Sequence, residues 1–265
     1  MSRIPRMLRD TDRQTTARKQ HVEAQVQQHD LNVMEPTLTR MANTLNIGGQ
    51  NKAVTQSQNR LHQALHVLTP TAPNYGLAQE AAGAMAHNAN LRADHALSSA
   101  QRAWLDDIFN GPRGGSVGGK QQVMGHLKER KRQKEAHDVF STMSMVAGFG
   151  ADSGADLSFV KRGNTIEGMM TSMQTAGPNR GVGFLGSKPS NISGPGVQTP
   201  GVGRAVIEHA NQLGRQDHAQ FMTLGAEGRE AQGFYQHMGF EKADGSPLQE
   251  RDFADHSIDL RKRIV

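Results

Sequence analysis

The stretch Gln198-Thr199-Pro200-Gly201-Val202-Gly203 places a proline and two glycines at the head of an apolar-periodic run. Apolar residues then recur at helical spacing, at Val202, Val206, Ala210 and Leu213. Gly214 follows, and glycine is suited to the C′ position that ends a helix. The sequence therefore predicts a glycine loop that opens a helix, with the end of that helix at Gly214.

The glycines of this loop suit a phosphate-binding site. The first backbone N–H groups of a helix have no intrahelical partner and point outward at the positive end of the helix dipole. Gly201 and Gly203 carry no side chain that would keep a phosphate away, and either can adopt a positive φ. A tight turn without a ligand would use the same residues, so the loop alone is a weak signal.

A second signal is the segment Ala231-Gln232-Gly233-Phe234-Tyr235-Gln236-His237-Met238-Gly239-Phe240. Before it, 219–224 is short and apolar, which predicts a buried strand. We expect a helix over 229–238, because Gly239 and the apolar residue after it have the pattern of a glycine C-cap. Tyr235 then lies in the final turn of that helix.

Together the two segments resemble the acyl-coenzyme A signature of the GNAT N-acetyltransferase family. The family patterns are Q/R-x-x-G-x-G/A, matched by Gln198, Gly201 and Gly203, and A-x-x-x-Y-x-x-x-G-F, matched by Ala231, Tyr235, Gly239 and Phe240. The resemblance implies an α/β fold: a mixed, mostly antiparallel central sheet flanked by helices, with a polar helical or disordered N-terminal extension. It covers about residues 150–265, most strongly 198–240.

The resemblance also implies a reaction. An acceptor amine would attack the thioester of acetyl-CoA directly in a ternary complex, so the protein mainly positions two reactants. The acetyl-CoA site would comprise Gln198, Gly201, Val202, Gly203 and Arg204. Tyr235 would be the general acid, because a phenol with a pKa of about 10 is a proton donor at neutral pH. Glu167 and Glu227 are the candidate general bases, and each could instead be a solvated surface carboxylate.

Segments around the signature predict further strands. Residues 156–161 and 165–171 are strand-like runs around a glycine hairpin turn. The stretch 177–196 is dense in Gly, Pro, Asn and Ser, which predicts loops that contribute to the acceptor site. The family's fourth strand would fall at 190–193. Residues 256–261 alternate polar and apolar side chains and are expected to form the closing strand.

The N-terminal part of the chain has a different composition. Eight of the nine Phe lie from Phe140 onward, and the first hundred residues contain no Phe or Trp. These residues are rich in Gln, Asn, Arg, Thr and His, which predicts disorder or marginal helices with little core. We expect a polar, flexible region over 1–75, a helical region over 76–140 and the GNAT-like core over 141–265.

Two helices are expected before the catalytic core. Ser98 and Gln101 have capping-box spacing, and this first helix would end at Asn110-Gly111-Pro112. The second helix is expected over 121–140. They would correspond to the two helices after the family's first strand, which the sequence does not reveal.

A net charge of +5 and an isoelectric point near 9.7 support an alternative. Basic residues gather in the second helix, at Lys128, Arg130, Lys131, Arg132 and Lys134. A non-catalytic module could use this run to bind nucleic acid or an acidic protein partner, although no aromatic residues interleave it for base stacking. A degenerate GNAT scaffold is a third alternative.

Other classes of protein have less support. No stretch is long and apolar enough to span a membrane, and no signal-peptide core follows the basic N-terminus, so we expect a cytoplasmic protein or one secreted without a signal peptide. The polar N-terminus suits a secreted bacterial effector with a role in virulence, and equally a plain disordered tail. The chain has no Cys and its twelve His are scattered, so we expect no metal site.

Overall fold

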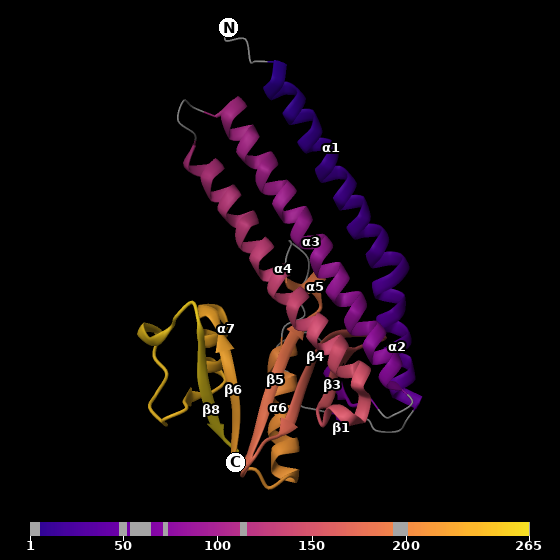
Figure 1. Cartoon of the computed structure of the whole chain (residues 1–265), viewed down its shortest axis with the longest axis vertical. Helices are drawn as coiled ribbons and strands as arrows, with labels where there is room; N and C mark the ends of the chain where they lie inside the picture. Colours follow the sequence, from indigo (N-terminus) through magenta and orange to yellow (C-terminus); the bar gives the residue numbers. More distant parts are fainter. Residues whose placement is uncertain are drawn as a thin grey trace. The chain divides into compact units, whose positions relative to one another are not determined.

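The computed structural model describes residues 6–47, 52–53, 65–70, 74–111, 116–192 and 201–264 (Figure 1). The chain divides into two compact units. The helical unit comprises residues 1–40, 80–144 and 188–198, and the sheet unit comprises residues 41–79, 145–187 and 199–265. Several helices contribute residues to both units, because the boundaries between the units fall inside them.

The helical unit is formed from long helices. Its elements are α1 (Arg6–His29), the π-helical segment η1 (Asp30–Met34), the first turns of α2 (Glu35–Ile47), most of α3 (Tyr75–Asn110) and α4 (Val117–Phe149), and the short α5 (Pro189–Ile192). Polar contacts link α3 to its neighbours on both sides. The Arg92 guanidinium is 2.6 Å from the Asp30 carboxylate, and Lys134 Nζ donates to Asn90 Oδ1 at 2.6 Å.

The core of the helical unit corrects the expectation that the first hundred residues have little to bury. Alanine, methionine and a few aliphatic residues form it in place of aromatic ones. Fully or almost fully buried positions include Val22, Val26, Met34, Leu38, Ala81, Ala82, Met85, Ala89, Ala93 and Ala96. Small side chains allow helices to approach closely, so a sequence poor in Phe still forms a packed core.

The boundaries of α3 and α4 also differ from expectation. Ser98 does not cap a helix start, because it lies inside α3, where its hydroxyl donates to the Asp94 carbonyl at 3.0 Å. Helix α4 begins at Val117 rather than Gln121 and continues to Phe149. Asp107 links the two helices, since its carboxylate accepts from the Ser116 N–H at 2.8 Å.

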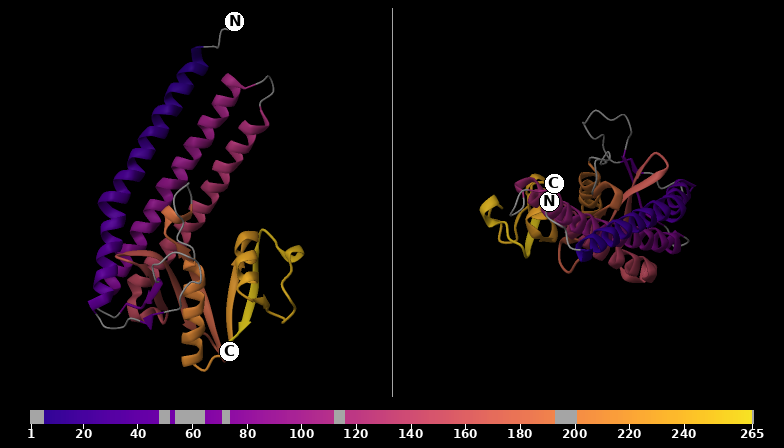
Figure 2. Two further views of the ribbon diagram at one scale, coloured as in Figure 1. Left: turned by 180° about the vertical axis from the view of Figure 1, so that it is seen from behind. Right: turned by 90° about the horizontal axis from the view of Figure 1, so that it is seen from above.

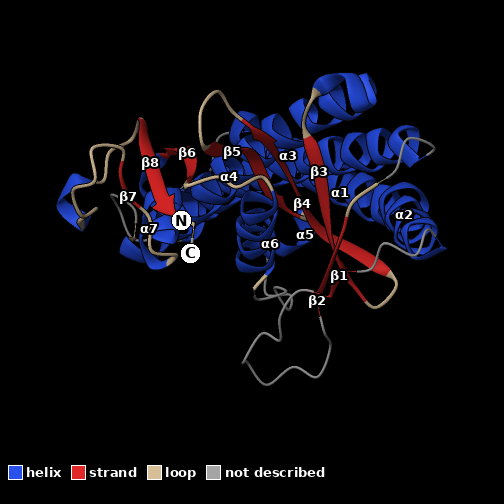
Figure 3. Ribbon diagram, turned by 90° about the horizontal axis from the view of Figure 1, so that it is seen from below, coloured by secondary structure: helices blue, strands red, loops and turns tan. Residues whose placement is uncertain are grey.

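The sheet unit contains a sheet of eight described strands, in the order β1-β2-β3-β4-β5-β6-β8-β7 (Figure 3). The strands are β1 (Lys52–Ala53), β2 (Leu65–Leu68), β3 (Asp156–Arg162), β4 (Thr165–Gln174), β5 (Asn179–Ser187), β6 (Phe221–Glu227), β7 (Glu241–Lys242) and β8 (Ser257–Arg263). All neighbouring strands are antiparallel except β5 and β6, which are parallel. The fold is therefore mixed α/β with a mostly antiparallel sheet.

The expected hairpin, the strand before Tyr235 and the closing strand are all present. β3 and β4 are joined through Gly163, whose φ is +57°, and β6 and β8 pair along their whole length. The sequence did not reveal a strand before the two helices. The structure has β1 and β2 there, and β2 precedes α3 and α4 in the chain and pairs with β3.

The prediction for the fourth strand was wrong. Residues 190–192 belong to α5, and the strand is β5, inside the stretch expected to be loops. Its glycines have a steric role that composition does not show. A Cβ on Gly183 would lie 2.8 Å from Thr171 Oγ1, and one on Gly181 would lie 2.9 Å from Thr175 Cγ2. Glycine is therefore favoured inside this strand, because the side chains of Thr171 in β4 and Thr175 just after it approach the strand closely.

Two helices of the sheet unit follow β5 in the chain: α6 (Val202–Gln216) and α7 (Gly228–His237) (Figure 2). The apolar stripe of α6 joins one hydrophobic cluster with Val67, Val160, Met170, Val182 and Met222 of the sheet. On the other face, the end of α2 approaches β3, where Lys161 Nζ donates to the Ala42 carbonyl at 3.4 Å.

Gly214 does not end α6, which continues to Gln216. A Cβ at position 214 would lie 2.4 Å from Ile264 Cδ1 and 3.7 Å from Arg180 Cβ. Glycine therefore occurs here because the chain after β8 and the start of β5 crowd the helix, and a helix interior tolerates it at a cost of about 1 kcal/mol relative to Ala.

Candidate active site

The sheet opens between its two parallel strands. Asn179–Gly181 pair with Phe221–Thr223, and the pairing then stops, although β5 continues to Ser187 and β6 to Glu227. The two strands meet at one end and separate toward their arrowheads in Figure 1. Backbone groups on the β6-facing edge of β5 beyond Gly181 therefore lack a strand partner. Ligands commonly bind at the carboxyl ends of parallel strands where such neighbours diverge.

A bulge bends β5 where the separation begins. Two of its residues, Gly183 and Phe184, lie opposite the single residue Thr171 of β4, between the Val182–Ser172 and Leu185–Met170 pairs. The Phe184 N–H donates to the Thr171 hydroxyl at 3.0 Å, which replaces a ladder bond. Bulges of this kind bend a strand and are frequent beside functional sites.

The other end of β5 is fixed by a buried arginine. The Arg180 side chain is 2% exposed and pairs with the carboxylates of Asp156 and Asp217. It also donates to the Ser172 hydroxyl at 2.8 Å. These contacts join the starts of β3 and β5 to the end of α6, so the paired end of β5 is rigid where its other end diverges.

Helix α6 begins beside this divergence. A Cβ on Gly168 of β4 would lie 2.5 Å from Val202 Cγ1 and 2.8 Å from the Gly186 carbonyl, so the helix start packs closely on β4 at a position where β5 also approaches. Gly201 is the N-cap with φ +87°, the left-handed conformation that the sequence predicted for one of the loop glycines. Its carbonyl accepts from the Ala205 N–H at 2.9 Å, and no side chain caps the helix.

The structure describes four of the five residues predicted to bind acetyl-CoA. Gln198 lies outside the described residues. The N–H groups of Val202, Gly203 and Arg204 precede the first intrahelical donor, so they are the orphan groups of the helix start. The Val202 side chain is buried, whereas Arg204 is exposed beside these groups.

The two signature segments meet in the fold. A Cβ on Gly203 would lie 2.8 Å from Phe234 Cζ, so the first turn of α6 packs directly against α7. The Phe234 and Tyr235 rings have centroids 5.0 Å apart, and the Tyr235 and Phe240 rings 5.3 Å apart. Gly203 therefore has a packing role that the motif alone did not indicate, and its role in binding phosphate remains a prediction.

Tyr235 is placed as expected in the last part of α7. Its side chain is 9% exposed within the cluster that contains Val202, and burial raises the pKa of Tyr235 to about 12. The hydroxyl makes no hydrogen bond to another described residue. Gly239 follows with φ +81°, and the N–H groups of Gly239 and Phe240 donate to Gln236 and Tyr235 carbonyls, both at 3.0 Å. This Schellman pattern confirms the predicted glycine C-cap.

Gln232 was missed by the sequence analysis, and it holds α7 in place. The fully buried amide donates to the carbonyls of Ala226, Ala254 and His256 at 2.8–3.1 Å and accepts from the Ala254 N–H at 2.7 Å. It thus links the end of β6 to the segment before β8. A lone glutamine in a helix carries no sequence signal for these contacts.

The structure places the two candidate bases differently. Glu167 of β4 is 1% exposed and lies 3.3 Å from the Arg162 guanidinium. It directly precedes Gly168, the residue against which Val202 packs. Glu227 is exposed, ends β6 and is the N-cap residue of α7. The pairing of Tyr235 as acid with either carboxylate as base remains a prediction.

Comparisons with known proteins give fold likenesses only. No protein-family model and no curated protein matches the chain. A Desulfovibrio desulfuricans structure named as a GNAT-family acetyltransferase is 17% identical, with 50% of this chain and 83% of that chain covered and a TM-score of 0.37. A Bacillus subtilis acetyltransferase in complex with CoA is 13% identical (46% and 83% covered, TM-score 0.34). The PaiA N-acetyltransferase of Thermoplasma acidophilum, in complex with coenzyme A, is 10% identical (76% and 99% covered, TM-score 0.36).

The identities and TM-scores of these three structures are low. Two further findings concern the described part of the chain. None of its helices combines the length and hydropathy that a membrane span requires. No three His, Asp or Glu side chains in it are grouped closely enough to hold a metal ion.

Proposed function

We propose that the chain is an N-acetyltransferase of GNAT type, which transfers the acetyl group of acetyl-CoA to an acceptor amine. The observation that carries this proposal is the meeting of the two signature segments. The glycine-headed start of α6 packs on the tyrosine-bearing turn of α7 through Gly203 and Phe234, beside the diverging parallel strands.

The start of α6 would bind the pyrophosphate of acetyl-CoA. Three orphan N–H groups, on Val202, Gly203 and Arg204, lie at the positive end of the helix dipole. The exposed Arg204 guanidinium adds a cation, and Gln198 belongs to the same motif. The pantetheine arm is an extended amide chain, so it would pair with the free edge of β5 beyond Gly181, as an added strand does.

The reaction would proceed by direct attack. The neutral acceptor nitrogen attacks the thioester carbon, a C–N bond forms, the C–S bond breaks, and the thiolate leaves. Tyr235 would give its hydroxyl proton to that thiolate, since a phenol whose pKa is about 12 stays protonated at neutral pH. The acceptor ammonium loses one proton to a base before it attacks, and the acylated nitrogen loses a second proton, which returns to the Tyr235 phenolate. Glu227 is open to solvent at the end of β6, whereas Glu167 is buried and paired with Arg162, so we assign the proton removal to Glu227.

Calorimetric titration of acetyl-CoA into the full chain tests the donor site. Arg204→Glu reverses one charge beside the orphan N–H groups, and a carboxylate in a first helical turn does not disfavour the helix. We expect binding at least about tenfold weaker than for the unmodified chain, as for loss of a charged hydrogen bond. Arg215→Glu makes the same change in the last turn of α6 and should leave the affinity within about twofold. No binding by the folded, unmodified chain would refute the proposal.

The alternative of a basic binding module has less support. Within the basic run of α4, Lys131 lies 3.7 Å from Glu135, and Lys134 Nζ donates to Asn90 Oδ1. Part of the run is thus engaged within the protein. Steeply salt-dependent binding to RNA or DNA that acetyl-CoA does not change would favour this alternative.

A further inference from the structure

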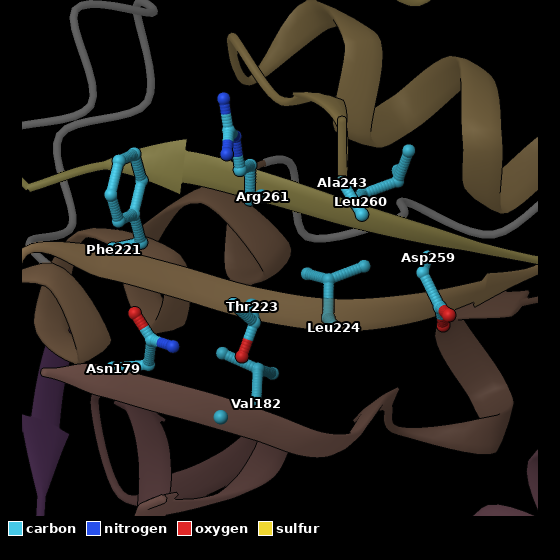
Figure 4. A pocket seen from close by; sticks show the side chains of 10 residues that line it. Asn179, Val182, Phe221, Thr223, Leu224, Ala243, Asp259, Leu260 and Arg261 are labelled. Atoms are coloured by element: carbon cyan, nitrogen blue, oxygen red, sulfur yellow. The ribbon is translucent and has the colours of Figure 1, made fainter. Parts of the chain in front are cut away.

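A cavity of about 480 Å³ lies on the sheet where β5, β6 and β8 come together (Figure 4). Phe221 and Thr223 of β6 and Asp259 and Arg261 of β8 line it, with Asn179 at the start of β5. Phe221 and Thr223 alternate with Met222 and Leu224, whose side chains are buried in the cluster under α6. The polar lining therefore belongs to the face of the sheet that α6 does not cover.

The cavity adjoins the point where the parallel strands part. The last β5–β6 pair is Gly181 with Thr223, and the next residues on both strands, Val182 and Leu224, also line the cavity. Both belong to the same hydrophobic cluster as Val202 and Tyr235. A molecule in the cavity and a donor held against α6 and α7 would thus approach the gap between the strands from opposite faces of the sheet.

One charge in the cavity is compensated and one is not. Arg261 Nε is 2.9 Å from Glu241 Oε1, and the guanidinium lies 4.9 Å from the centre of the Phe221 ring. The Asp259 carboxylate makes no hydrogen bond or ion pair with any residue that the structure describes. Figure 4 shows Phe221 and Arg261 toward one end of the cavity and Asp259 toward the other.

Asp259 lies at the end of the cavity nearer the divergence. It faces Gly225 in the β6–β8 register, two residues beyond the last β5–β6 pair. Gly225 has no side chain to fill the space in front of the carboxylate, since a Cβ there would lie 3.8 Å from Asp259 Oδ1. A cation bound to Asp259 would therefore sit at the reacting end of the cavity.

We propose that this cavity is the acceptor site and that it takes a small primary amine with a single positive charge on an apolar body. This proposal rests on the acetyltransferase function proposed above. A single uncompensated carboxylate matches one ammonium group, and the residues that line the cavity include no second carboxylate for another cation. The Phe221 ring supplies an apolar surface for the rest of the molecule, and Val182, Leu224 and Leu260 line the cavity where it borders the hydrophobic cluster.

Phenethylamine is a suitable probe, because it has one ammonium group and a compact apolar body. Its binding to the full chain is measured by calorimetry without acetyl-CoA, and its acetylation is measured by release of coenzyme A thiol. In Asp259→Asn, which keeps the shape of the side chain, we expect the dissociation constant and the KM for phenethylamine to rise about fivefold to tenfold. The affinity for acetyl-CoA should not change.

Asp255→Asn is the matched control, because Asp255 is exposed and lies outside the cavity. It should leave phenethylamine binding unchanged. Spermidine, with several positive charges, should bind more weakly than phenethylamine. If the chain binds acetyl-CoA but phenethylamine does not bind, or binds equally to Asp259→Asn, the cavity proposal fails and the enzyme proposal stands. If phenethylamine binding depends on Asp259 while acetyl-CoA does not bind, the amine site stands and the acetyltransferase proposal fails.

Discussion

Tyr235 has the most specific role at the scale of single residues. The change Tyr235→Phe removes only the hydroxyl and leaves the ring between Phe234 and Phe240. We expect kcat for acetyl transfer to fall about 100-fold, as for loss of a general acid, with the KM for acetyl-CoA and the melting temperature almost unchanged. Because burial raises the pKa of Tyr235 to about 12, its ionisation should not reduce the activity of the unmodified enzyme up to pH 10.

The only other tyrosine supplies the control. Tyr75 begins α3, and Tyr75→Phe should leave kcat within about twofold. Equal losses of kcat in the two variants, or an unchanged kcat in Tyr235→Phe, would remove Tyr235 from the chemistry.

Gln232 is expected to matter for stability. Gln232→Ala would leave the carbonyls of Ala226, Ala254 and His256 and the Ala254 N–H without this partner, so we expect the free energy of unfolding to fall by about 3 kcal/mol. Gln236→Ala on the same helix removes a single bond to the Leu248 carbonyl and should cost about 1 kcal/mol. Chemical denaturation of both variants measures the difference, and equal losses would contradict the anchoring role.

Single residues differ in how far sequence predicts them. The helix-terminal positions of Gly201 and Gly239 were predicted. Gly201 precedes a helix and Gly239 follows one, each with a positive φ, and such a local requirement is visible in a short motif. The partners of Gln232 are the carbonyls of Ala226, Ala254 and His256, and those of Arg180 are side chains on β3, β4 and the segment after α6. Such contacts come from tertiary packing, which local patterns do not encode.

At the scale of elements, the helices α1 and α3 should respond to acid. His29 ends α1, His95 lies in α3, and burial is the main cause that lowers the pKa of each below 6.5. The folded state therefore favours the neutral imidazoles, whereas the unfolded chain binds protons at a pKa of about 6.5. Their contribution to stability is complete above that pH and is lost progressively as the pH falls below it.

Trp104, the single tryptophan, lies in α3 and reports on the helical unit by its fluorescence. We expect the midpoint of chemical denaturation to decrease between pH 7.5 and pH 5.5, and the decrease to be smaller when His29 and His95 are both changed to Gln. His256→Gln, at an exposed position in the sheet unit, should not alter it. A midpoint independent of pH would show that the two imidazoles do not resist protonation.

Elements were predicted best where pattern and packing agree. The β3–β4 hairpin turns at Gly163 and α7 is followed by Gly239, and both glycines have a positive φ. β5 was missed because its glycines resemble a loop, although they occur where β4 crowds the strand. α3 was predicted too short because Ser98 has the spacing of a capping box, yet its hydroxyl bonds to the carbonyl four residues earlier.

At the scale of the whole molecule, the sequence predicted the fold class. It did not predict the buried core of the long helices in the N-terminal part of the chain. Two motifs in the second half of the chain were enough to predict a mostly antiparallel sheet with flanking helices. Composition misled for the first part, since an alanine-rich helix such as α3 packs without aromatic residues. The location of the protein and its suggested role as a secreted effector remain predictions from composition.

The central claim is that α6 and α7 form one acetyl-CoA site beside the diverging strands. A crystal structure of the full chain with coenzyme A tests it most directly. We predict pyrophosphate oxygens within about 3.2 Å of the N–H groups of Val202, Gly203 and Arg204, and the coenzyme sulfur within hydrogen-bonding reach of the Tyr235 hydroxyl. Coenzyme A bound to the basic run of α4, or bound with its sulfur far from Tyr235, would contradict the claim.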